Sequence, residues 1–137
     1  MKRFFLLTLA SAALLGASAA PVKTYEVKSP DGRLALVLTA GERLSFTVAR
    51  DGETLVAPSE MALTLSTGEV LGESPRVRSA RRRAVTETID APLYRQSRFD
   101  AAYNELDLRL RGDYGILARA YDDGVCYRFY TERDGEL

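Results

Sequence analysis

The acidic residues Glu105 and Asp107 form the pair in this sequence whose spacing best suits acid–base chemistry. Two positions apart on one strand face, they would lie about 6.5–7 Å from each other. Two carboxylates at roughly this separation cleave glycosidic bonds, one as the acid and the other as base or nucleophile. A catalytic acid also needs apolar surroundings that raise its pKa, and nothing apolar beside this pair indicates them. We therefore interpret both residues as part of a solvated strand face.

A second acidic pair, Asp122 and Asp123, is followed directly by Gly124. Asp side chains at such positions hydrogen-bond their own backbone and so prepare a turn. We expect this structural role, and the alternative is a contact with calcium or with a sugar. On these grounds we assign no residue of the chain as catalytic, as a cofactor ligand or as a metal ligand.

The residue inventory removes several classes of enzyme. The chain of 137 residues holds no His, no Trp and one Cys. Without His there is no Ser-His-Asp or Cys-His nucleophile and no imidazole acid or base. A single Cys makes neither an internal disulfide nor a Cys-rich zinc site, and we expect Cys126 to be a small buried residue. Acidic and basic residues balance at 19 each, so no global positive field predicts binding to nucleic acid.

Arginine and tyrosine also cluster in ways that suggest binding. Five arginines fall within eight residues, at Arg76, Arg78, Arg81, Arg82 and Arg83. They fit either an anion-binding patch or an edge strand protected by charge, and we favour the edge strand. Tyrosines offer a sugar-stacking surface, although aromatic strand residues more often pack in a core, as we expect here. The tyrosines in question are Tyr94, Tyr103, Tyr114, Tyr121, Tyr127 and Tyr130.

The N-terminus has the pattern of a secretory signal peptide. Lys2 and Arg3 precede an apolar run, and Ala17-Ser18-Ala19 fits the small-x-small cleavage pattern. The run is shorter than the ~20 apolar residues that a membrane span requires. We therefore expect residues 1–19 to be removed, residues 20–137 to form the mature domain, and the protein to be secreted or periplasmic, with no membrane attachment after cleavage.

The remainder of the chain shows the period-two alternation of β-strands. Apolar residues alternate with polar ones in several short runs, and Leu34 to Leu38 is apolar on both faces, as in a central strand covered on both sides. The alternating apolar sets are Leu44, Phe46 and Val48; Met61, Leu63 and Leu65; Leu106, Leu108 and Leu110; and Val125, Tyr127 and Phe129. Asp31-Gly32, Asp51-Gly52 and Asp123-Gly124 are typical of tight hairpins. Frequent turns and short strands predict an all-β fold, an antiparallel β-sandwich.

Two segments are harder to interpret. Phe99 to Arg111 also matches helical spacing, although the alternation in its second half favours a strand. The region from Pro75 to Gln96 is the least regular part of the chain.

Three motifs carry a more specific resemblance. They are Tyr103-Asn104-Glu105-Leu106, then Arg119-Ala120-Tyr121-Asp122-Asp123-Gly124-Val125, and then Tyr127-Arg128-Phe129. Together with Val27-Lys28-Ser29-Pro30-Asp31-Gly32 after the signal peptide, they resemble the N-terminal domain of glycoside hydrolase family 97. The similarity runs from about Tyr25 to Tyr130.

The resemblance implies a secreted, calcium-dependent, exo-acting α-glucosidase or α-galactosidase. In that family the N-terminal domain is a galactose-mutarotase-like super-sandwich that packs on a catalytic (β/α)8 barrel. The barrel carries the catalytic carboxylates, and both these acids and the calcium site map beyond this chain. We therefore expect part of such a sandwich, incomplete at its C-terminal side. The expected partners are the barrel of the full-length chain and a carbohydrate.

The sequence therefore predicts a non-catalytic domain that supports an absent barrel and contributes to the rim of a carbohydrate pocket. This chain alone is expected to be inactive and to bind no cofactor, whereas the full-length parent is expected to be a calcium-dependent glycoside hydrolase. The alternative is a free-standing extracytoplasmic β-sandwich that binds a ligand and has no enzyme activity.

Overall fold

The computed structural model describes residues 21–90, 92 and 97–134, and over these ranges every regular element is a β-strand. The first sheet contains β1 (Lys23–Lys28), β2 (Leu34–Ala40), β3 (Leu44–Arg50) and β4 (Glu53–Glu60), antiparallel and in chain order. The second contains β7 (Val77–Asp90), β8 (Arg98–Leu110), β9 (Tyr114–Ala120) and β10 (Val125–Thr131), in the order β10-β9-β8-β7. A two-stranded ribbon of β5 (Leu63–Thr64) and β6 (Val70–Leu71) lies between them in sequence. The predicted all-β antiparallel sandwich is confirmed, and the predicted signal peptide lies outside the described residues.

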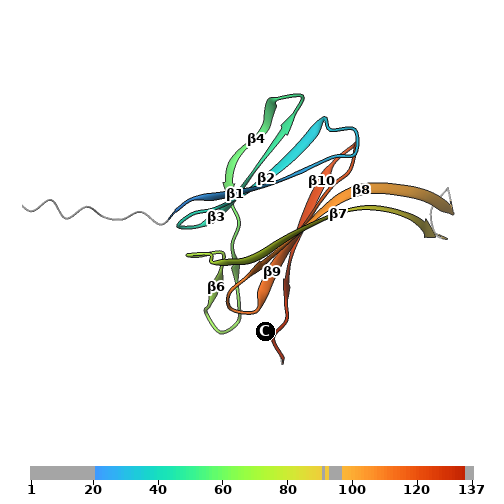
Figure 1. Ribbon diagram of the computed structural model, residues 1–137. Coiled ribbons are helices and arrows are strands. Elements are labelled where there is room, and N and C mark those ends of the chain that lie inside the picture. Colours follow the sequence, from blue (N-terminus) through green and yellow to red (C-terminus); the bar gives the residue numbers. More distant parts are fainter. Residues whose placement is uncertain (1–20, 91, 93–96, 135–137) are drawn as a thin grey trace, which may run out of the picture.

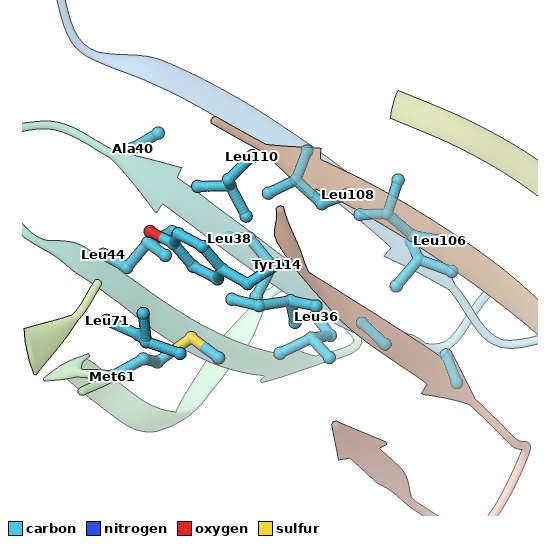
Figure 2. Close-up of a cluster of buried hydrophobic side chains, with 14 of the residues drawn as sticks. Leu36, Leu38, Ala40, Leu44, Met61, Leu71, Leu106, Leu108, Leu110 and Tyr114 are labelled. Atoms are coloured by element: carbon cyan, nitrogen blue, oxygen red, sulfur yellow. The ribbon is translucent and has the colours of Figure 1, made fainter. Parts of the chain in front are cut away.

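The core lies between the inner faces of the two sheets, where β1 and β2 contact β8 and β9. Leu36 and Leu38 of β2, Leu106 and Leu108 of β8 and Ile116 of β9 are all completely buried. Figure 2 shows leucines of both sheets meeting between the ribbons. Burying each such side chain contributes about 1.5–3 kcal/mol, so this layer of apolar side chains is the main source of stability.

One end of the core is closed by the segment around β5 and β6. Met61 and Leu71 are buried there beside Leu44 and Tyr114, as Figure 2 shows. The Tyr114 hydroxyl accepts a hydrogen bond of 3.3 Å from the backbone N–H of Gly72. A buried Tyr usually needs such a partner, and this one ties the ribbon to the second sheet.

The alternating runs have mostly the predicted faces. Leu106, Leu108 and Leu110 are buried on β8, so the strand interpretation is confirmed and the helical alternative is excluded. The prediction for β2 is only half correct. This strand is central between β1 and β3, but Val37 and its neighbours on the outer face are only partly buried, because only one sheet face meets the other sheet.

The Asp-Gly dipeptides behave differently at different turns. Asp51 and Gly52 both have positive φ (52° and 86°), as expected for the tight hairpin between β3 and β4. At Asp123-Gly124 the chain also reverses, with the N–H of Tyr121 donating to the carbonyl of Gly124 at 2.8 Å. Gly124, however, is not among the positive-φ glycines, so the backbone of this turn differs from that at Asp51-Gly52.

The longest element of the fold is the hairpin of β7 and β8, with strands of 14 and 13 residues. Its distal half projects well beyond the rest of the sandwich (Figure 1). Most of the region from Pro75 to Gln96 is therefore a regular strand, contrary to our expectation. Its many polar residues hid the strand pattern, because the projecting part has little core to face. The arginine-rich segment does form an edge strand, as predicted. Over the described ranges, no helix is long and apolar enough to cross a membrane.

Candidate functional site

The most elaborate polar arrangement lies on the outer face of the second sheet, away from the core. Arg83 on β7, Glu105 on β8 and Arg119 on β9 are direct neighbours in the strand register. Tyr103 lies two residues before Glu105 on β8, and Glu87 lies four residues after Arg83 on β7, so both share this face of the sheet. We call these five residues the outer-face cluster. The period-two geometry of the sheet brings them together from three strands.

Glu105 is the centre of the outer-face cluster. One carboxylate oxygen, Oε1, accepts a 2.6 Å hydrogen bond from Nε of Arg83, and Oε2 accepts one of 2.8 Å from Nε of Arg119. The Glu105 side chain is only 3% exposed, although it lies on the outer face. The interpretation of Glu105 as solvated is therefore wrong, because the two arginine side chains on the neighbouring strands cover it.

The electrostatics of Glu105 decide what chemistry it can do. Burial by itself raises the pKa of the carboxyl, but the hydrogen bonds and charges of Arg83 and Arg119 outweigh burial and hold its pKa below the ordinary value. The carboxyl is thus ionised at neutral pH and holds no proton to donate. A general acid for glycoside cleavage needs the opposite shift.

Tyr103 packs against this ion pair. Tyr103 as a whole is 2% exposed, and the guanidinium carbon of Arg119 lies 4.6 Å from the centroid of its ring. The ring of Tyr121 packs against the ring of Tyr103, with 4.8 Å between the two ring centroids. Burial and the 2.9 Å hydrogen bond that its hydroxyl donates to Oε1 of Glu87 raise the pKa of Tyr103. The phenol is therefore a fixed donor within the cluster.

Asp107, the second member of the predicted pair, has different partners from Glu105. Its Oδ1 accepts a 2.5 Å hydrogen bond from the hydroxyl of Tyr130, and Oδ2 lies 3.6 Å from Nε of Arg109. Burial, followed by the bond to Asp107, raises the pKa of Tyr130 to about 12. Asp107 is 24% exposed, so solvation is partly confirmed for this residue. The two carboxylates are held in separate networks rather than facing a shared substrate.

Asp122 has a structural role that links the two sheets. Its Oδ1 accepts a 2.9 Å hydrogen bond from the backbone N–H of Asp31, in the turn between β1 and β2. A structural role is thus observed, but the prediction that this side chain bonds its own turn is wrong, because Asp122 supports a turn on the opposite sheet. Within residues 21–90, 92 and 97–134, no three potential ligands cluster as a metal would require.

An open hollow of about 260 Å³ lies where edge strand β1 meets the β7–β8 hairpin. Nε of Arg82 donates to the carbonyl of Glu26 at 2.9 Å, and Nδ2 of Asn104 donates to that of Lys28 at 2.8 Å. These side chains thus satisfy outward carbonyls of β1. The sequence analysis did not predict that these side chains would bond the backbone of β1. The arginine run was the one feature of the sequence that pointed to a special role for this segment.

The burial of the tyrosines and of the cysteine agrees only in part with the prediction. Tyr114 is buried in the core, as predicted, and Tyr103 is buried on the outer face instead, whereas Tyr127 is 40% exposed. Tyr94 lies outside the described residues. Cys126 is exposed, so its predicted burial is wrong. It alternates with Val125 and Tyr127, whose side chains are on the inner face, and therefore points outward.

By its fold the protein is a two-sheet antiparallel β-sandwich with ion pairs on its outer face. The family profile described as Glycosyl-hydrolase 97 N-terminal matches residues 27–136. The chain therefore belongs to this family, and it is an N-terminal domain of a family 97 glycoside hydrolase. The resemblance found in the sequence is confirmed.

Relatives with known names agree with this assignment. Retaining alpha-galactosidase of Bacteroides thetaiotaomicron is 37% identical over 110 residues, which are 80% of this chain and 17% of the relative. A family 97 enzyme from Pseudoalteromonas sp. strain K8, solved in complex with panose, has a TM-score of 0.72 at 17% identity. A β-arabinopyranosidase structure has the same score at 20% identity. Both alignments cover 81% of this chain and 18% of the other, so the chain spans less than a fifth of its relatives' length.

Proposed function

We propose that this chain is a non-catalytic sandwich that supports the catalytic barrel of a secreted family 97 hydrolase. The observation that carries the proposal is the state of Glu105. The residue best placed by spacing to act as an acid is ionised and saturated by two arginines. The family match supports the same conclusion, since it concerns an N-terminal domain.

The proposal extends to the parent enzyme. We assign it the hydrolysis of terminal α-galactosides or α-glucosides, with calcium bound in the part of the parent that carries the catalytic acids. Support for the galactoside comes from the 37% identical relative, which is named a retaining alpha-galactosidase. Within this chain, the projecting β7–β8 hairpin (Figure 1) is the segment that would reach the rim of a carbohydrate pocket.

The purified chain should release no p-nitrophenol from the α-galactoside or the α-glucoside, with or without calcium. The full-length relative from Bacteroides thetaiotaomicron, which is named a retaining alpha-galactosidase, serves as the positive control for the α-galactoside. Calcium-dependent turnover that disappears in Glu105→Gln would overturn the supporting role and make the chain an enzyme. Specific sugar binding by a chain encoded by an intact gene that ends at Leu137 would favour the free-standing module instead.

Export is part of the proposal and rests on the pattern of residues 1–19. Cleavage after Ala19 or Ala20 gives an exported protein that begins at Ala20 or Pro21. N-terminal sequencing of the extracytoplasmic fraction measures this directly, and an intact Met1 there would contradict it.

A further inference from the structure

The arginines on the outer face of the second sheet have no part in the function proposed above. Five of them point to this face, because their register partners and the alternation along each strand place them opposite the buried leucines. We call these five residues the arginine face: Arg81 and Arg83 on β7, Arg109 on β8, Arg119 on β9 and Arg128 on β10. Strand register thus gathers cations from four strands on one surface.

The arginine face is positively charged although the chain as a whole is neutral. The chain holds 19 basic and 19 acidic residues. The three register rows that contain the arginine face hold these five arginines and two acids, Glu105 and Asp107. Such a local excess of positive charge creates a field at the surface that a net charge of zero conceals.

The two acids also lie deeper than the arginines. The Glu105 side chain is 3% exposed and that of Asp107 is 24% exposed, whereas Arg83 is 66% exposed. Arg81 and Arg128 are exposed as well, and among the residues that the structure describes neither has an acidic partner at ion-pair distance. A ligand that approaches this surface therefore meets guanidinium groups before carboxylates.

The arginine face lacks the apolar anchor that a protein partner would need. The energy of protein binding is concentrated in large side chains that are buried at the centre of the contact. The Tyr103 ring beside Arg119 is already buried within the domain, and the Tyr130 hydroxyl is already bonded to Asp107. Charge must therefore supply most of the affinity at this surface, which favours a polyanion over another protein.

We propose that the arginine face binds an acidic polysaccharide, a chain of sugars that carry carboxylate or sulfate groups. Guanidinium groups bind oxyanions through paired, charge-assisted hydrogen bonds. Arg81 and Arg128 lie at opposite edges of the four-stranded sheet, about 14 Å apart, so the surface fits several charged groups along an extended ligand. The choice of a polysaccharide over a nucleic acid rests on the export proposed above, which N-terminal sequencing tests separately.

Isothermal titration calorimetry of the purified chain tests this proposal with three probes. Dextran sulfate and polygalacturonate carry sulfate and carboxylate groups, and unmodified dextran is the neutral control. Both anionic probes should bind at an ionic strength of about 10 mM, where charges act over ~30 Å. Their affinity should fall about tenfold or more at about 150 mM, where this range is ~8 Å, and dextran should not bind at either. Tighter binding of one anionic probe identifies the preferred group, and either preference supports the proposal.

Two double variants with the same change of charge locate the site. Arg81→Gln combined with Arg128→Gln should weaken binding of the anionic probes about five- to tenfold at low ionic strength. Lys23→Gln combined with Arg50→Gln removes two exposed cations from the first sheet and should weaken binding less than about twofold. Unchanged melting temperatures show that both variants are folded. Amide chemical shifts of the unmodified chain give a second readout, and the anionic probes should move those of β7 to β10 rather than those of β1 to β4.

Four outcomes would overturn the proposal. The absence of binding at low ionic strength would show that the arginines serve the fold alone. Equal losses in the two double variants would show that binding follows net charge rather than this surface. Equal binding of neutral dextran would remove the role of charge, and polyglutamate that binds as tightly as both anionic probes would assign the surface to acidic protein segments. None of these results affects the supporting role, which the hydrolysis assay tests separately.

Discussion

Replacing Glu105 with Gln removes the charge at the centre of the outer-face cluster while keeping the shape of the side chain. The hydrogen bond to Arg119 joins a carboxylate that is 3% exposed to a guanidinium that is 30% exposed. Hydrogen bonds to charged groups contribute about 1.5–3 kcal/mol, and we expect Glu105→Gln to lower the free energy of unfolding by about this amount at pH 7. Arg83 is 66% exposed, so water screens its contribution.

The loss of stability caused by Glu105→Gln should depend on pH in a defined direction. The pKa of Glu105 is lower in the folded protein than in the unfolded chain, where it is about 4.3. The stabilisation is therefore complete above the unfolded pKa and disappears as the pH falls through the folded pKa. The difference between the wild-type protein and Glu105→Gln should be constant near neutral pH and shrink below about pH 4.3.

Urea denaturation across this pH range measures both effects, with Glu53→Gln, at an exposed position of β4, as the control. The control should change stability by less than about 0.5 kcal/mol. A loss for Glu105→Gln no larger than that of the control, or one that stays the same into acid, would refute the account of a buried, ionised carboxylate.

Two further predictions concern packing and backbone geometry. Leu108→Ala empties a fully buried site and should cost about 2–5 kcal/mol in urea denaturation, whereas Leu55→Ala, at 58% exposure, should cost less than about 0.5 kcal/mol. Gly72→Ala would drive a Cβ into the carbonyl of Met61 at a φ of 103°, so it should lower the melting temperature well below that of Gly52→Ala. Gly52 has a φ of 86° and open space around it, so the excess loss for Gly72, about 1–3 kcal/mol, reports the steric clash together with its larger φ. Equal losses at the two glycines would contradict this reading of the turn.

The inner faces of the sandwich were predictable from sequence because alternation reports burial directly. Leu106 and Leu108 follow a strict period of two, and both are fully buried on β8. The projecting strand β7 was not predictable in this way, since a strand with little core beside it has no apolar face to reveal it. Periodicity therefore finds the strands that build the core and misses those that leave it.

The candidate site was predicted less well than the fold. The spacing of Glu105 and Asp107 correctly placed both on one face, but their partners come from other strands. Arg83 is 22 residues away from Glu105 in sequence and Arg119 is 14 residues away. Strand register brings these charges together, and a single sequence does not display register. For the same reason, the burial of Glu105 was not apparent before the sheet was known.

The order of strands along the chain has a consequence for how the protein folds. Each four-stranded sheet consists of consecutive strands joined by hairpins, and within the part of the chain that the structure describes no strand crosses from one sheet to the other. Most pairings therefore close short loops, a topology associated with faster folding than interleaved Greek-key sandwiches. The first sheet is complete at Glu60, before any residue of the second is needed, so synthesis from the N-terminus delivers the two halves one after the other. Docking of two preformed meanders is then the step that buries the leucines, and mutations at their contact should slow folding more than changes in the hairpin turns do.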